Sequence, residues 1–95
     1  MQPLTYRGTL TGARKALLSA VGEWPNSEIV EATGNYVHAK FTSKFFRFVD
    51  DVEFCMYDDA GIIHVRSSSR MGYFDFGVNR RRIERIRARF IALTT

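Results

Sequence analysis

Cysteine, proline and long apolar runs are all scarce in this sequence. Cys55 is the single cysteine, which excludes an intramolecular disulfide and any zinc site built on several cysteines. No apolar run approaches the roughly 20 residues that a membrane-spanning helix needs. Residues 1–10 also lack the charged and apolar regions of a signal peptide. We therefore expect a soluble, cytoplasmic protein that has no membrane span and no disulfide framework.

The composition is typical of a small globular domain. The chain has 95 residues, of which 45% are hydrophobic and 14% aromatic, enough for one modest core. We expect a single domain over residues 1–95. The formal net charge of +4 favours anionic partners in a general way, but charge alone does not identify a ligand.

Two segments carry apolar residues at helical spacing. The first begins after Thr9 or Thr11, either of which can cap it, and closes at Gly22 and Pro25. The second runs from about residue 79 to 93 at the end of the chain. Each segment predicts a helix with one buried face. The apolar positions are Ala13, Leu17, Ala20, Val21 and Trp24 in the first helix, and Ile83, Ile86, Phe90 and Leu93 in the second.

Between the helices the apolar pattern alternates with a period of two, which predicts strands. Four strands are expected, at residues 28–32, 36–42, 51–57 and 61–67, joined as two hairpins by turn residues. Residues 4–8 read as either a short edge strand or a lead-in. The predicted fold is α+β with two layers: a four-stranded, mainly antiparallel sheet with two helices on one face, in the order α-β-β-β-β-α.

The loop at residues 58–61 predicts the register of the second hairpin. It places Glu53 opposite Arg66 and Cys55 opposite His64, and we expect Glu53 and Arg66 to form a cross-strand ion pair. The face of the sheet away from the helices then carries charged residues together with Tyr36, Tyr57 and Ile62. That open face is a candidate surface for a protein partner or for self-association.

Residues 41–54 and 64–87 resemble the hallmark segments of the domain-of-unknown-function 1499 family, and the similarity extends over nearly the whole chain. Many relatives are bacterial or plastid proteins with an upstream segment containing Cys and Pro, and some carry an export signal or membrane anchor. No such segment precedes Tyr6 here. The resemblance implies no activity. The residues that carry it are Asp50, Asp51, Glu53, Phe54, Arg66, Ser67, Ser69, Arg70, Gly72, Tyr73, Asp75, Gly77, Asn79, Arg80, Glu84 and Arg87.

Residues 64–87 have an unusual density of charge. Asn79 is a typical N-cap, and it would place arginines in the first helical turn, where the unpaired amides are already positive. Arginines in that position need anions nearby. Our first hypothesis is a structural lock. In it Asp75 accepts hydrogen bonds from helix amides and an arginine, and Asp50 or Asp51 pairs with Arg66 or Arg70. The candidate residues are Asp50, Asp51, Arg66, Ser67, Ser69, Arg70, Asp75, Asn79, Arg80 and Arg81.

The same residues allow two binding hypotheses. In one, the arginines and serines at the helix start bind a small anion such as phosphate. In the other, arginines of the last helix track a nucleic-acid backbone while aromatic rings of the open face stack on bases. The residues invoked for the second are Arg81, Arg82, Arg85, Arg89, Tyr36 and Tyr57. Acidic residues nearby oppose a phosphate chain.

Catalytic and metal sites have weaker support. Cys55 opposite His64, with His38 one strand over, has the residue types of a metal site, but such residues more often pack or face solvent. The serines at residues 67–69 stand near histidines without a nucleophile-elbow pattern. We expect no catalytic residue, no metal ligand and no cofactor. The sequence predicts a non-catalytic binding or interaction domain whose charged stretch is mainly structural.

Overall fold

A computed structural model describes residues 2–44, 47–57, 59–70 and 78–94. Their structure is α+β, with two helices and one five-stranded sheet. The four expected strands are present, and a fifth strand corrects the predicted count. In chain order the elements are β1 (Leu4–Thr5), α1 (Leu10–Gly22), β2 (Ser27–Thr33), β3 (Tyr36–Thr42), β4 (Val49–Tyr57), β5 (Ile62–Ser69) and α2 (Val78–Thr94).

The sheet has the strand order β1-β5-β4-β3-β2, and every neighbouring pair is antiparallel. The added strand, β1, pairs Leu4 with Ile63 and Thr5 with Ile62 at the edge of the sheet. Two residues are too few to show alternation, so the pattern alone did not separate this strand from a lead-in. Leu4 is buried in the core.

The register of the second hairpin is as predicted. Glu53 lies opposite Arg66, and Cys55 lies opposite His64. The first helix also begins where the pattern indicated, because the Thr9 hydroxyl accepts a hydrogen bond of 3.0 Å from the Gly12 amide. The turn after Tyr57 and the Thr9 cap were therefore predicted correctly from local residues.

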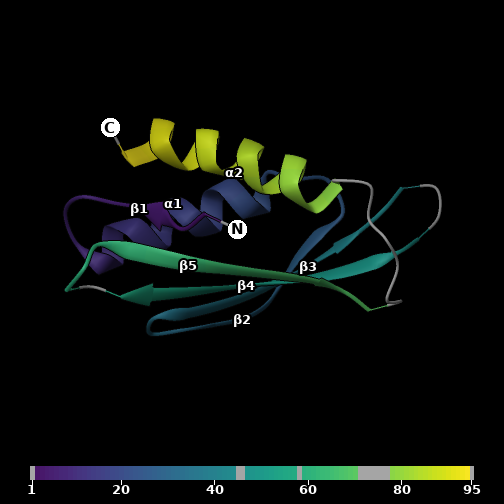
Figure 1. Ribbon diagram of the computed structural model, residues 1–95, viewed down its shortest axis with the longest axis horizontal. Coiled ribbons are helices and arrows are strands. Elements are labelled where there is room, and N and C mark those ends of the chain that lie inside the picture. The colour runs from purple at the N-terminus through teal and green to yellow at the C-terminus, as the bar shows by residue number, and fades with distance from the viewer. Residues whose placement is uncertain (1, 45–46, 58, 71–77, 95) are drawn as a thin grey trace.

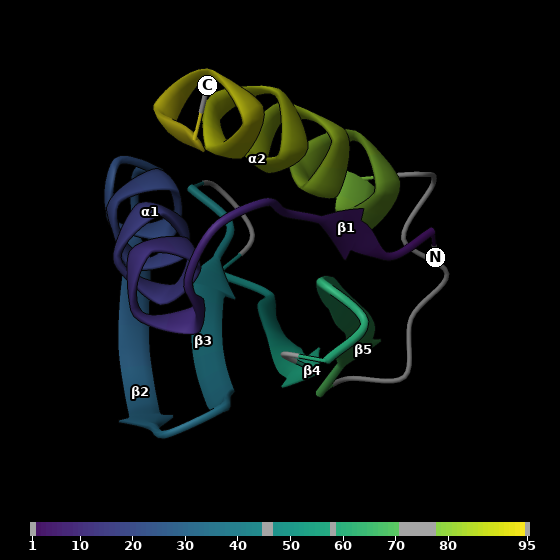
Figure 2. The same cartoon turned by 90° about the vertical axis from the view of Figure 1, so that its left-hand side faces the viewer.

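The core lies between the sheet and the helices. Phe54 and Val52 of β4, Leu17 of α1 and Phe90 of α2 all belong to one buried cluster. Figures 1 and 2 show both helices on the same side of the sheet. In α2 the expected stripe of Ile83, Ile86 and Phe90 is buried. Leu93 was wrongly assigned to that stripe: it is 39% exposed in the last turn of the helix.

Candidate functional site

Asp50 and Asp51 are consecutive residues of β4 and lie on opposite faces of the sheet. Asp50 shares the core face with Val52 and is only 7% exposed, whereas Asp51 lies on the open face and is half-buried. Each carboxylate holds a different arginine of the charged stretch. The strand therefore separates the predicted cluster into two small sites.

On the open face, Asp51 binds Arg70 and His38. The Arg70 guanidinium donates two hydrogen bonds to the carboxylate, from Nε at 2.7 Å and from Nη2 at 3.0 Å. His38 Nε2 lies 2.7 Å from the same carboxylate. The Arg70 hydrogen bonds, assisted by His38, lower the pKa of Asp51 despite partial burial, which acts in the opposite direction. Of the pairings expected between Asp50 or Asp51 and Arg66 or Arg70, the structure forms the one between Asp51 and Arg70.

On the core face, Asp50 binds Arg82. Arg82 Nη1 lies 3.3 Å from Asp50 Oδ2 and donates a 2.6 Å hydrogen bond to Asn79 Oδ1. The guanidinium carbon lies 4.7 Å from the centre of the Phe41 ring, and Arg82 is 5% exposed. Our lock hypothesis omitted Arg82. The burial of each residue had a signal, because Arg82 lies four residues before Ile86 and eight before Phe90 on the buried helix face, and Asp50 has the strand parity of Val52.

The helix start corrects the predicted role of Asn79. We expected Asn79 to be the N-cap, but α2 begins at Val78, so Asn79 lies inside the first turn. Asn79 is 5% exposed, and its side-chain oxygen accepts the hydrogen bond from Arg82 three residues along the helix. Asn79 therefore belongs to the buried network around Asp50.

Arg80 and Arg81 are not part of either site. Both side chains are exposed, and neither forms an ion pair with any residue that the structure describes. Ser69 lies opposite Asp50 in the ladder. Ser67 lies opposite Val52, and its hydroxyl is buried without a hydrogen-bond partner among the described residues. Asp75 lies outside the described residues.

The expected ion pair between Glu53 and Arg66 is absent from the described part of the chain. The register brings the two residues opposite each other, but the Tyr36 hydroxyl donates a 2.6 Å hydrogen bond to Glu53 Oε2 and the Arg66 side chain is exposed. Hydrogen bonding to Glu53, together with burial, raises the pKa of Tyr36 to about 12. Glu53 thus has a neutral partner in place of the predicted cation.

The residues of the weaker hypotheses are dispersed or already engaged. Cys55 and His64 are cross-strand neighbours, but the His64 ring stands edge-on to Tyr57 at 5.2 Å, and His38 binds Asp51. Over the described ranges, no three His, Cys, Asp or Glu residues gather as they would around a metal ion. Among these ranges there is also no helix that is both long and apolar enough to cross a membrane.

The nucleic-acid hypothesis required helix arginines and open-face aromatics on one surface. The structure places them on opposite sides, because α2 covers the core face of the sheet and Tyr36 lies on the other face (Figure 1). Two of its arginines are also engaged: Arg82 binds Asp50, and Arg89 binds Glu23 of α1 at 2.8 Å. A surface that combines these groups is therefore not formed.

Sequence comparison supplies the family. The model of the family described as "Protein of unknown function (DUF1499)" matches residues 1–90 of the 95-residue chain. The chain belongs to this family. Membership confirms the resemblance carried by residues 41–54 and 64–87, and it assigns no activity. No curated protein and no solved structure matches the chain.

Proposed function

We propose that this member of the DUF1499 family is a non-catalytic binding domain, and that residues 64–87 act chiefly as a structural lock. The observation that supports the lock is that β4 forms an ion pair on each face of the sheet. Asp51 binds Arg70, which precedes residues 71–77, and Asp50 binds Arg82, which follows them. Two ion pairs on opposite faces thus tie both ends of that connection to one strand.

The charges of the lock are poorly suited to acid-base catalysis. A general acid or base works best with a pKa near the working pH. The pKa of Asp51 instead lies below its ordinary value because Arg70 and His38 bind its charged form. The pKa of Tyr36 is raised to about 12 by its hydrogen bond to Glu53 and by burial. These pKa shifts support a structural role, in which the side chains hold each other in place.

The binding role rests on apolar residues at the other end of the sheet. The two-layer arrangement leaves one face of the sheet open, and there Tyr57 is 50% exposed opposite Ile62. Ile91, near the end of α2, is also 50% exposed. Exposed apolar residues at one end of a small domain favour a protein partner there. Some charged side chains elsewhere on the open face pair within the sheet, as Lys40 does with Glu28 at 3.3 Å.

A thermal-shift panel at fixed ionic strength separates the lock from an anion site. The lock predicts that phosphate and sulfate stabilise the domain no more than chloride does. An anion site would bind phosphate, and a ligand present at 100 times its dissociation constant adds about 2.7 kcal/mol to stability. Stabilisation by phosphate that disappears in the double variant Arg80→Ala, Arg81→Ala would replace the lock with the anion site.

The exposed start of α2 favours a second candidate function. Arg80, Arg81 and Arg85 are exposed, and in the described part of the chain none of them forms an ion pair. Such a group favours an anionic partner. The test compares Arg81→Ala with Arg66→Ala, which removes the same charge from the opposite face. A specific site predicts weaker oligonucleotide or phosphate binding only for Arg81→Ala, and equal weakening indicates a general charge effect.

A further inference from the structure

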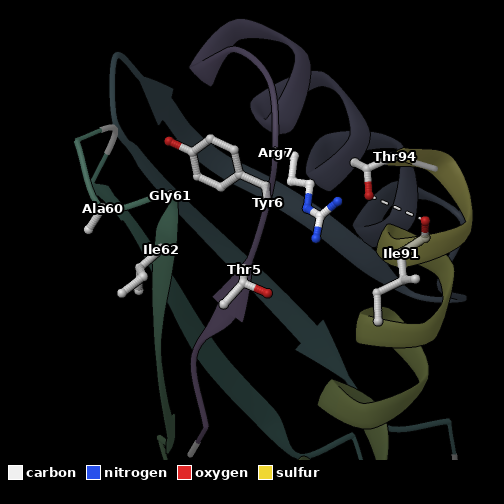
Figure 3. Close-up of a pocket in the computed structure, with 8 residues that line it drawn as sticks. All are labelled: Thr5, Tyr6, Arg7, Ala60, Gly61, Ile62, Ile91 and Thr94. Carbon is white, nitrogen blue, oxygen red and sulfur yellow. Dashed lines mark hydrogen bonds between the residues drawn. The ribbon is translucent and has the colours of Figure 1, made fainter.

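A groove lies between β1, the β4–β5 turn and the end of α2 (Figure 3). Its volume is about 760 Å³, within the range of about 300 to 1,000 Å³ that is usual for ligand sites. Within the described parts of the charged stretch, residues 64–70 and 78–87, no residue lines it. The lining residues are Thr5, Tyr6, Arg7, Ala60, Gly61, Ile62, Ile91 and Thr94.

The groove borders an uncovered piece of sheet edge. Tyr6 N–H donates to Gly61 C=O at 2.9 Å, so the N–H and C=O of Thr5 point away from β5. α2 lies on that side, because Arg87 donates to the Pro3 carbonyl at 2.7 Å. Pro3 has the same strand parity as Thr5. Arg87 therefore covers the edge at Pro3, and the groove begins where that cover ends.

The close approach of Gly61 to Tyr6 holds this edge in place. Gly61 has a positive φ of 62°, and a Cβ atom at this position would lie 2.8 Å from the Tyr6 carbonyl oxygen. Only glycine lets the turn approach β1 so closely. Glycine at this position therefore keeps the β4–β5 turn in close contact with β1 beside the groove.

Arg7 supplies a cation to the same groove. Its side chain reaches from the end of β1 towards the last turn of α2 (Figure 3). Arg7 is exposed, and none of the described carboxylates forms an ion pair with it. The nearby Thr94 hydroxyl already donates to the carbonyls of Phe90 and Ile91. The Arg7 guanidinium is thus available to a carboxylate from outside.

The walls beside Arg7 are apolar. Ile62 lies at one end of the groove, and Ile91, which is 50% exposed, lies at the other. A ligand for this site needs a carboxylate, an apolar group beside it and backbone able to pair with Thr5. The last residue of a peptide carries all three, whereas an acidic side chain within a peptide brings no apolar group of its own.

We propose that this groove binds the C-terminal residue of a partner protein in extended conformation. Its carboxylate pairs with Arg7, its apolar side chain packs against Ile91, and its backbone extends the sheet at Thr5. The inference deepens the proposed binding role by naming the chemistry of the partner. It is independent of the lock, which variants of Asp50 and Asp51 test through stability.

The test is an NMR titration of the whole chain with pooled hexapeptides that end in a free Val, Leu or Ile. We expect saturable shifts of the Thr5, Arg7, Ile62 and Ile91 amides. Amidating the peptide C-terminus should weaken binding about tenfold or more, because the charge-assisted hydrogen bond is lost. Absence of saturable shifts at millimolar peptide, or equal binding of the amidated pool, would overturn the proposal.

Substitutions of Arg7 and Ile91 test which groove residues contact the peptide. Arg7→Gln should weaken binding about tenfold or more, and the matched control Arg66→Gln, an exposed arginine on the open face, should leave it unchanged. Ile91→Ser should weaken binding of the free-acid pool. Its melting temperature should equal that of the wild-type protein, because Ile91 is half exposed. Equal affinities of Arg7→Gln and Arg66→Gln would refute the role of Arg7. A failed titration together with a destabilised Asp50→Asn variant would leave the lock standing.

Discussion

Asp50 and Asp51 are neighbours on one strand, yet they hold their arginines in different surroundings. The side chains of Asp50 and Arg82 are 10% and 5% exposed, whereas those of Asp51 and Arg70 are 20% and 49% exposed. The exposed pair has the shorter contact, 2.7 Å against 3.3 Å. Distance alone would therefore predict that the exposed pair matters more for stability. Burial reverses the order, because a charge left without its partner is costly only where water cannot reach it.

The largest expected effect is that of Asp50→Asn, which removes the countercharge of the buried Arg82. Breaking a buried pair from one side typically costs about 3 to 5 kcal/mol, a large share of the stability of a small domain. Urea unfolding followed by circular dichroism measures it. Glu31→Gln, at an exposed carboxylate of β2, is the control and should change stability little. If both variants lose the same stability, burial does not determine the cost of breaking the Asp50–Arg82 pair.

A double replacement sharpens the same point. Asp50→Leu combined with Arg82→Met removes both buried charges and fills the space with apolar groups. Such exchanges are often nearly neutral, so we expect stability within about 1 to 2 kcal/mol of the natural protein and well above that of Asp50→Asn. Urea unfolding of the two variants side by side decides it. A double variant as unstable as the single one would show that the pair supplies net stability.

Asp51→Asn should cost less, about 1 kcal/mol, because its pair is half exposed. The folded-state pKa of Asp51 lies below its ordinary 3.8, so its contribution is fully present above pH 3.8 and is lost as the pH falls through the folded-state pKa. The stability difference between Asp51→Asn and the natural protein should therefore shrink in acid. Unfolding at neutral pH and at about pH 3 tests this. A difference that persists in acid would contradict it.

The smallest effect at neutral pH is expected for Tyr36, whose hydroxyl is the uncharged partner of the Glu53 carboxylate. The pKa of Tyr36 is raised from 10.0 to about 12, so its contribution is present below pH 10 and is lost as the pH rises towards 12. Ultraviolet titration should show a late tyrosine ionisation near pH 12 that is lost in Tyr36→Phe. Glu53→Gln should move that ionisation towards 10. An unchanged titration in Glu53→Gln would exclude Glu53 as the cause.

The sequence predicted most of the elements and part of the site. Hydrophobic period located both helices and four strands, and the turn after Tyr57 predicted a register that the structure confirms. It also indicated that Asp50 or Asp51 pairs with Arg66 or Arg70, and the structure has Asp51 with Arg70. It failed for the ion pair of Glu53, because Tyr36 lies on the neighbouring strand β3 and competes for the same carboxylate. A register places residues opposite each other without deciding which neighbour donates.

Local chemistry by itself determined the Thr9 cap, the turns and the strand alternation of this protein, because each of these depends on residues close together in the chain. Three features were decided only by tertiary structure: the short edge strand β1, the pairing of Arg82 with Asp50, and the groove beside Arg7. Each joins segments that lie far apart in sequence. Their formation depends on how α2 packs over the sheet. A pattern within one segment does not show which distant segment will lie against it.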